Sequence, residues 1–126
     1  MTWDKKYSNA IAKSVVKLIL KKARKIISKE DDWCKIAVAR TCFDSPVAYD
    51  SPYAEKWCGT GAINLAIVRF LPENQEAWQS IRSAAEKHLC YHIKDHCFKS
   101  FETYNDRDEI THKKVLKVFD KAIKSL

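Results

Sequence analysis

The sequence predicts an all-α fold: a single small domain over residues 1–126, with about four main helices and a short irregular or β-hairpin insertion after the first helix. Two observations support this fold class. The chain holds only two glycines and three prolines, which leaves few of the tight turns that a many-stranded sheet requires. Most of its apolar residues also recur at the three- and four-residue spacing of a helix face.

Residues 3–28 predict a long amphipathic helix. Its apolar face comprises Trp3, Tyr7, Ala10, Ile11, Val15, Leu18, Ile19 and Ile26. The opposite face is basic and comprises Lys13, Lys17, Lys21, Arg24 and Lys25. Two interpretations of this basic face remain open. It is either a solvated surface or a stripe that binds the phosphate groups of an anionic partner.

A segment of a different kind follows at residues 33–50. It is partly β-branched and contains the turn signal Asp44-Ser45-Pro46. We expect this segment to form either a small hairpin or an ordered loop that packs on the helices.

The central stretch, residues 57–62, contains both glycines of the chain. A glycine inside a helix costs about 1 kcal/mol relative to alanine, so both glycines need a structural reason. One interpretation is a continuous helix over residues 52–71, capped by Ser51, in which the glycines let a neighbouring element approach closely. Pro52 at its start and Pro72 after its end favour this interpretation.

A second interpretation breaks the chain at Gly59, uses Thr60 to cap a new helix and places Cys58 just outside its N-terminus. There the helix dipole favours a thiolate. Cys58, a histidine and Asn105 or Asp106 also follow the chain order of a cysteine-protease triad, which gives the alternative hypothesis of an enzyme built around Cys58. Because such an order arises easily by chance, the favoured interpretation of Cys58 is a small buried residue on the core face.

Two further helices follow. Asn74 is expected to cap a helix that runs to about Phe98, and its apolar stripe comprises Trp78, Ile81, Ala85, Leu89 and Ile93. Residues 99–110 are predicted to form a loop. Thr111 is then expected to cap the last helix, whose apolar face comprises Val115, Leu116, Val118, Phe119, Ala122, Ile123 and Leu126.

Three histidines, His88, His92 and His96, lie four residues apart on the predicted third helix. Two histidines at this spacing can share a metal ion, so His88 and His92 are alternative metal ligands. No second segment supplies a Cys or His pair at ligand spacing. The favoured interpretation is therefore a partly exposed polar face, with no metal and no cofactor.

The composition limits the cellular compartments and the kinds of partner that we expect for this protein. No apolar run approaches the roughly 18 residues of a membrane span, and lysines interrupt the first residues, so we expect neither a membrane partner nor an export signal. Five cysteines are then expected to be free thiols in the cytoplasm. The net charge of +7 is uneven, because residues 1–29 carry +8, residues 30–110 carry −5 and residues 111–126 carry +4.

Several motifs together carry a resemblance. They are Trp33, Ala39-Arg40, Trp57-Cys58-x-x-Gly61-Ala62-x-x-x-Ala66, Tyr104-Asn105-Asp106, Thr111-x-x-x-Val115-Leu116 and Asp120-x-Ala122-Ile123. From about Val15 to Leu126 the chain resembles a family of small uncharacterised bacterial and phage proteins, known only as a domain of unknown function. The resemblance implies a helical fold with one continuous central helix, and it implies no activity. The chain departs from this family at Lys113 and Lys114, where relatives usually carry acidic residues.

These observations lead to one leading functional hypothesis. We expect a non-enzymatic, basic, cytoplasmic binding protein for an anionic partner, either a nucleotide-like ligand or nucleic acid, encoded by a phage or mobile element. Trp57, Asn105 and Asp106 are candidate ligand-binding residues as the aromatic and polar walls of a pocket, although Asn and Asp also organise loops. The alternatives are the Cys58 enzyme and a protein-interaction module that inhibits a host factor. The sequence does not predict an oligomeric state.

Overall fold

The computed structural model describes residues 5–73, 75–93 and 100–126, with side chains from residue 13 onward. Within these residues the fold consists of four long helices, one short helix and a small sheet, which confirms the predicted fold class. The helices are α1 (Lys5–Ile26), α2 (Gly59–Phe70), α3 (Trp78–Tyr91), α4 (Phe101–Asn105) and α5 (His112–Ser125), with short 3-10 turns η1 (Glu30–Asp32) and η2 (Gln75–Ala77).

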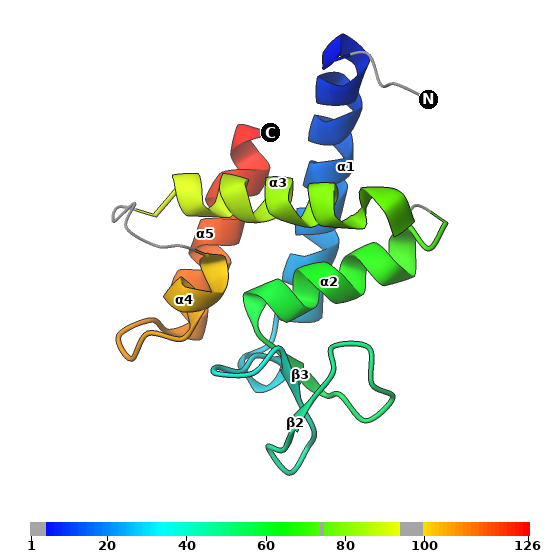
Figure 1. The fold of residues 1–126 in the computed structure, drawn as a ribbon. Coiled ribbons are helices and arrows are strands. Elements are labelled where there is room, and N and C mark those ends of the chain that lie inside the picture. Colours follow the sequence, from blue (N-terminus) through cyan, green and yellow to red (C-terminus); the bar gives the residue numbers. More distant parts are fainter. Residues whose placement is uncertain (1–4, 74, 94–99) are drawn as a thin grey trace.

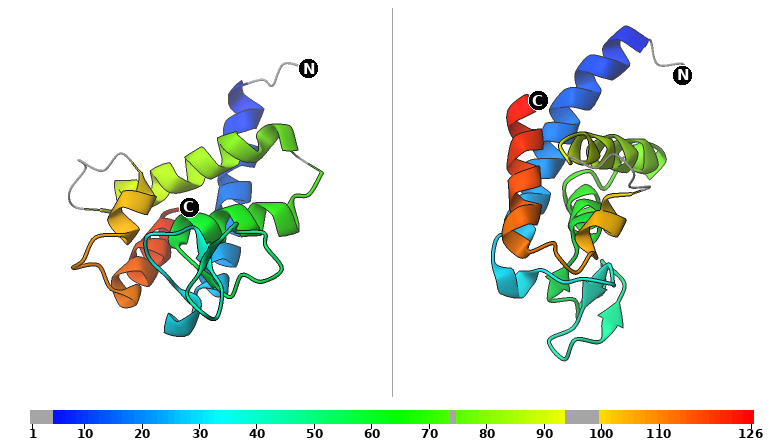
Figure 2. Two further views of the ribbon diagram at one scale, coloured as in Figure 1. Left: turned by 60° about the horizontal axis from the view of Figure 1, so that its bottom comes forward. Right: turned by 90° about the vertical axis from the view of Figure 1, so that its left-hand side faces the viewer.

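The helices pack around α1, which contacts α2, α3 and α5 (Figure 1). α5 runs beside α1, and α3 runs across both of them. The sheet insertion between α1 and α2 lies at the end of the molecule opposite the start of α1 (Figure 2). None of the helices in the described residues combines the length and the apolar composition needed to cross a lipid bilayer.

The buried face of α1 differs from the predicted one. It comprises Val16, Ile19, Leu20 and Ala23, and the buried Ile27 continues it just after the helix ends. Leu18, which was expected on the apolar face, is 40% exposed. Because apolar residues occupy nearly every position from Val15 to Leu20, the sequence pattern fits more than one face, and packing against three other helices selects the one that is buried. The predicted apolar residues at positions 3–11 lie outside the described side chains.

A three-stranded antiparallel sheet forms the insertion, in the order β2-β1-β3. The strands are β1 (Ala39–Arg40), β2 (Pro46–Val47) and β3 (Lys56–Trp57). Ala39 pairs with Val47 on one side and with Trp57 on the other. The hairpin expected within residues 33–50 is confirmed, but the insertion also takes in residues 51–57.

The prediction of a continuous helix over residues 52–71, which the family resemblance also implied, is wrong. β3 occupies Lys56–Trp57, and α2 begins only at Gly59. The N-cap is Cys58 rather than Thr60: the Cys58 Sγ accepts a hydrogen bond from the Gly61 N–H at 3.2 Å. The Cys58 N–H in turn donates to the carbonyl of Val38 at 3.2 Å. Sheet pairing between distant residues therefore overrides the local helix signals.

The close approach expected at the two glycines is confirmed. A Cβ at Gly61 would lie 1.9 Å from the backbone carbonyl oxygen of Val38. A Cβ at Gly59 would lie 2.2 Å from Cε1 of Phe101 in α4, which is fully buried. Both glycines are thus required because the first turn of α2 packs directly against the insertion and against α4.

Two predictions for the C-terminal half differ from the structure. α3 ends at Tyr91 rather than near Phe98, while Phe98 and the expected cap Asn74 lie outside the described residues. The predicted loop over residues 99–110 contains the short helix α4, because Ser100 caps it by accepting a hydrogen bond from the Thr103 N–H at 3.3 Å. The predicted cap of the last helix is confirmed, since the Thr111 hydroxyl accepts from the Lys114 N–H at 3.3 Å.

Candidate functional site

A buried polar junction joins the insertion to the helices, and Asn105 lies at its centre. The Asn105 side chain at the end of α4 is fully buried. Its Oδ1 accepts from the Trp33 indole N–H at 2.8 Å and from the Gly59 backbone N–H at 3.1 Å. Its Nδ2 donates to the Cys34 carbonyl and to the Asp106 Oδ1, both at 3.1 Å. The amide therefore uses both acceptor and both donor positions within the protein.

Asp106 extends this junction to an exposed turn of the insertion. Its Oδ1 also accepts from the backbone N–H of Ile36 at 2.8 Å. Ile36 has φ of 64°, a conformation that is unusual for a β-branched residue, and its side chain is 74% exposed. Lys35 adds a further link, because its ammonium group donates to the carbonyl of Arg107. Each of the four successive residues 33–36 is thus hydrogen-bonded to one of the residues 105–107 at the end of α4 and just after it.

The three predicted ligand-binding residues are therefore brought into one region, but by different bonds. Asn105 and Asp106 bond to the insertion, whereas the half-buried Trp57 donates its indole N–H to the carbonyl of Tyr49 at 2.9 Å. Sequence reasoning missed Trp33 as the partner of Asn105. The aromatic residue itself was visible, but 72 residues separate it from that amide, and no local pattern signals such a pair.

Cys58 has both of the environments that the sequence offered as alternatives, a helix N-terminus and a buried position. It stands at the N-terminus of α2, and it is also fully buried. Burial raises the pKa of its thiol from 9.0 to about 12, and this effect outweighs the hydrogen bond from the Gly61 N–H, which lowers the pKa. This cysteine is therefore protonated at neutral pH, and no described histidine is bonded to it as a base.

The two described histidines of α3 have other surroundings. The Nε2 of His92 lies 3.1 Å from the hydroxyl of Ser125 in α5. Partial burial lowers the pKa of His88, and the nearby charges of His92 and Lys13 lower it further. In the part of the chain that the structure describes, no group of three or more His, Cys, Asp or Glu side chains is placed to hold a metal ion. His96 lies outside that part.

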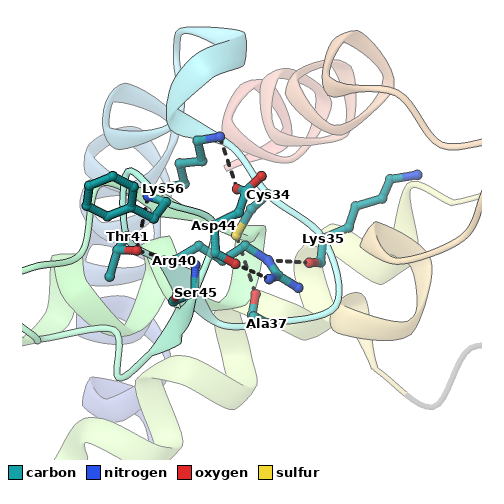
Figure 3. A network of polar contacts seen from close by, with 9 residues as sticks. Cys34, Lys35, Ala37, Arg40, Thr41, Asp44, Ser45 and Lys56 are labelled. Carbon is teal, nitrogen blue, oxygen red and sulfur yellow. Dashed lines mark hydrogen bonds and ion pairs between the residues drawn. The ribbon is translucent and has the colours of Figure 1, made fainter.

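A shallow hollow of about 380 Å³ opens on the insertion, lined by Glu30, Trp33, Cys34, Lys35, Arg40, Asp44 and Lys56. Figure 3 shows its polar contacts. The Arg40 guanidinium donates to the Lys35 carbonyl at 3.2 Å and to the Asp44 carbonyl at 2.6 Å. The Lys56 ammonium pairs with the Asp44 carboxylate at 3.2 Å. These cations stabilise the hairpin, and their charge is partly neutralised there.

A basic face forms where α1 and α5 lie side by side. Arg24 of α1 and Asp120 of α5 form an ion pair at 2.5 Å across the contact between these helices. Lys17 and Lys21 precede Arg24 at spacings that keep them on its side of α1, and Lys117 and Lys124 flank Asp120 in the same way. We define the basic face as Lys13, Lys17, Lys21 and Lys25 of α1 with Lys113, Lys117, Lys121 and Lys124 of α5.

These lysines are available to an external partner. Seven of the eight are exposed and Lys17 is half-buried, and none forms an ion pair within the described residues. Asp120 is the only acidic residue in α1 or α5, and Arg24 already neutralises it. The sequence showed the α1 lysines and the +4 charge of the C-terminal segment separately, and only the packing of α5 on α1 brings the two together.

Comparison with known proteins identifies a family for this chain. A family of unknown function, DUF6197, matches residues 13–125. No curated protein and no solved structure matches the chain. The matched range includes most of α1 together with the insertion and the remaining helices, and so it covers the polar junction and the basic face. The chain belongs to the DUF6197 family of unknown function.

Proposed function

We propose that this protein is a non-enzymatic nucleic-acid-binding protein that holds the phosphate backbone on the basic face of α1 and α5. The observation that carries the proposal is the set of eight lysines on two adjacent helices, whose only acidic residue is already neutralised. A concentrated positive surface of this kind attracts a polyanion and releases its counterions on binding.

The spacing of the lysines suits an extended phosphate backbone better than a single small anion. Lys13, Lys17, Lys21 and Lys25 follow one another at four-residue steps, which are about 6 Å apart along a helix. The residues of the basic face are all lysines, whose ammonium groups pair with phosphates as point charges. We therefore expect contacts with phosphates to dominate, and affinity to depend little on base sequence.

Two other observations favour this proposal over its alternatives. In the hollow on the insertion, Arg40 and Lys56 are already bonded to Asp44, so a nucleotide-like ligand would compete with those contacts. The raised pKa and full burial of Cys58 disfavour a nucleophilic cysteine. The cytoplasmic location and the phage or mobile-element origin stay predictions.

Fluorescence anisotropy with a short labelled DNA duplex tests the proposal. We expect binding at low salt, with an affinity that falls steeply as salt increases. Replacing Lys17 and Lys21 by glutamate should weaken binding and reduce the slope of log K against log salt by about 1.8, if each lysine neutralises one phosphate.

The matched control is the pair Lys29→Glu and Lys87→Glu, which changes the net charge equally at exposed positions outside the basic face. This control should retain nearly the wild-type slope. Three results would count against the proposal: no binding at low salt, binding that ignores salt, or equal loss in the two double variants.

A further inference from the structure

Most of the large apolar side chains that the described residues expose lie in two places. Ile36, Phe43 and Tyr53 stand on three turns of the insertion and are 74%, 87% and 74% exposed. Leu18 and Phe70 lie on α1 and at the end of α2. Arg40 bonds to the carbonyls of Lys35 and Asp44 and so holds the turns of Ile36 and Phe43 next to each other. Exposed apolar side chains that gather on one part of a surface mark a contact surface more often than single ones do.

The three turns of the insertion share one device. In each, the backbone N–H of the exposed apolar residue donates to a side-chain oxygen. Ile36 donates to Asp106 at 2.8 Å, Phe43 donates to Thr41 at 3.2 Å, and Tyr53 donates to Ser51 at 3.1 Å. The apolar side chains are therefore presented on fixed turns rather than on loose loops. A surface that is already ordered loses less conformational entropy when it binds a partner.

The exposed charge around these turns is mainly negative, although Lys56 neutralises Asp44. Within residues 30–57, the exposed charged side chains are all acidic, namely Glu30, Asp31, Asp44, Asp50 and Glu55. The basic residues Lys35, Arg40 and Lys56 are half-buried and take part in bonds to the protein. Glu30, Asp31, Asp50 and Glu55 form no ion pair within the described residues, and we call the three turns with these four side chains the acidic tip. Its partner must offer apolar contacts together with positive charge.

The same chain carries a surface with the complementary properties. The Lys22 ammonium lies 4.6 Å from the centre of the Phe70 ring, which joins α1 to the end of α2. Leu18 lies one turn before Lys22 on the same side of α1. Arg69, which is exposed, precedes Phe70 in the last turn of α2. We call these four residues the α1–α2 patch. It combines two exposed apolar side chains with two cations.

We propose that the acidic tip of one copy docks on the α1–α2 patch of a second copy. Each surface supplies what the other requires, because the tip is apolar and acidic while the patch is apolar and basic. The two surfaces belong to different elements of the chain, so the contact is head to tail and can propagate into a ring or a chain of copies. This assembly requires neither DNA nor the basic face.

Sedimentation velocity of the full chain without nucleic acid tests this assembly. The weight-average mass should rise with protein concentration at low salt, and the rise should shrink at high salt because salt screens the charges. A tip variant (Asp50→Lys with Glu55→Lys) and a patch variant (Lys22→Glu with Arg69→Glu) should each lose the rise. All four side chains lie at least partly on the surface, so both variants should keep the wild-type circular dichroism spectrum.

Mixing the two variants gives the decisive measurement. The reversed tip of one then faces the reversed patch of the other, so the mixture should regain the mass that each variant alone has lost. A charge-matched control, Lys87→Glu with Lys121→Glu, should associate like the wild type. A wild-type chain that stays monomeric at every concentration would overturn the proposal. So would association that survives both reversals, or a mixture that stays monomeric.

Discussion

Replacing Asn105 by alanine should be one of the most destabilising single substitutions in the chain. The side chain is fully buried and makes four hydrogen bonds that tie the insertion to α2 and α4. Alanine removes all four bonds at once. It leaves the indole N–H of Trp33, the backbone N–H of Gly59 and the carbonyl of Cys34 without this partner.

The cost follows from the number of groups that lose a partner. A buried polar group left unpaired costs about 1–3 kcal/mol. The N–H of Gly59 and the carbonyl of Cys34 belong to buried residues, whereas Trp33 is half-buried and can regain part of its bond from water. We therefore expect a loss of about 3–5 kcal/mol, which is a large part of the roughly 5–15 kcal/mol that stabilises an ordinary domain.

Urea unfolding monitored by circular dichroism and by tryptophan fluorescence measures this loss. Asn64→Ala is the matched control, because Asn64 is a half-buried residue of α2 whose side chain makes no hydrogen bond within the described residues. This control should change the free energy of unfolding by less than about 1 kcal/mol. A loss of less than about 1 kcal/mol for Asn105→Ala, or a loss no larger than that of the control, would contradict the stabilising role of the four hydrogen bonds.

Four other tests address the remaining features. Gly61→Ala places a Cβ 1.9 Å from the Val38 carbonyl oxygen, so it should lower the unfolding free energy by about 1–3 kcal/mol or more, and a wild-type urea midpoint would contradict this. Because burial raises the pKa of Cys58 to about 12, its thiol should react with an alkylating reagent at pH 8 about a thousandfold more slowly than a thiol of pKa 9.0. Mass spectrometry of the folded protein measures this labelling rate, and fast labelling of Cys58 would favour the hypothesis of a Cys58 enzyme. The unfolded chain ionises this thiol first, so the contribution of Cys58 to stability should be lost as pH rises from about 9 towards 12, which urea midpoints across that range would detect. Ile36→Asn should leave the unfolding free energy unchanged or raise it by up to about 1 kcal/mol, because asparagine tolerates φ of 64° better than a β-branched residue does. A clear drop in melting temperature would show that the exposed isoleucine side chain makes stabilising contacts.

Local signals in the sequence predicted the features that depend on neighbouring residues. Helical spacing predicted α1, α3 and α5, and the Thr111 side chain predicted the start of α5. The cost of glycine in a helix suggested, in one of two interpretations, that both central glycines allow a close approach, and the structure has this approach without the continuous helix that the interpretation assumed. The stripe of lysines on α1 was also predictable, because these residues recur at the four-residue spacing of one helix face.

Tertiary packing decided the features that depend on residues far apart in the chain. α2 starts at Gly59 because Trp57 pairs with Ala39 in the sheet, a pairing that no signal near Pro52 contains. Asn105 bonds to groups 46 and 72 residues away, so the sequence offered either loop organisation or ligand binding for it.

Cys58 and the basic face show the same division most clearly. The sequence set a helix N-terminus against a buried position for Cys58, and the structure has both, with burial dominating its pKa. The lysines of α1 and α5 become one face only because α5 packs beside α1, a contact that the Arg24–Asp120 pair bridges across 96 residues. Spacing along the chain determines what each helix presents, whereas the choice of neighbours depends on long-range burial and pairing, which a local pattern does not encode.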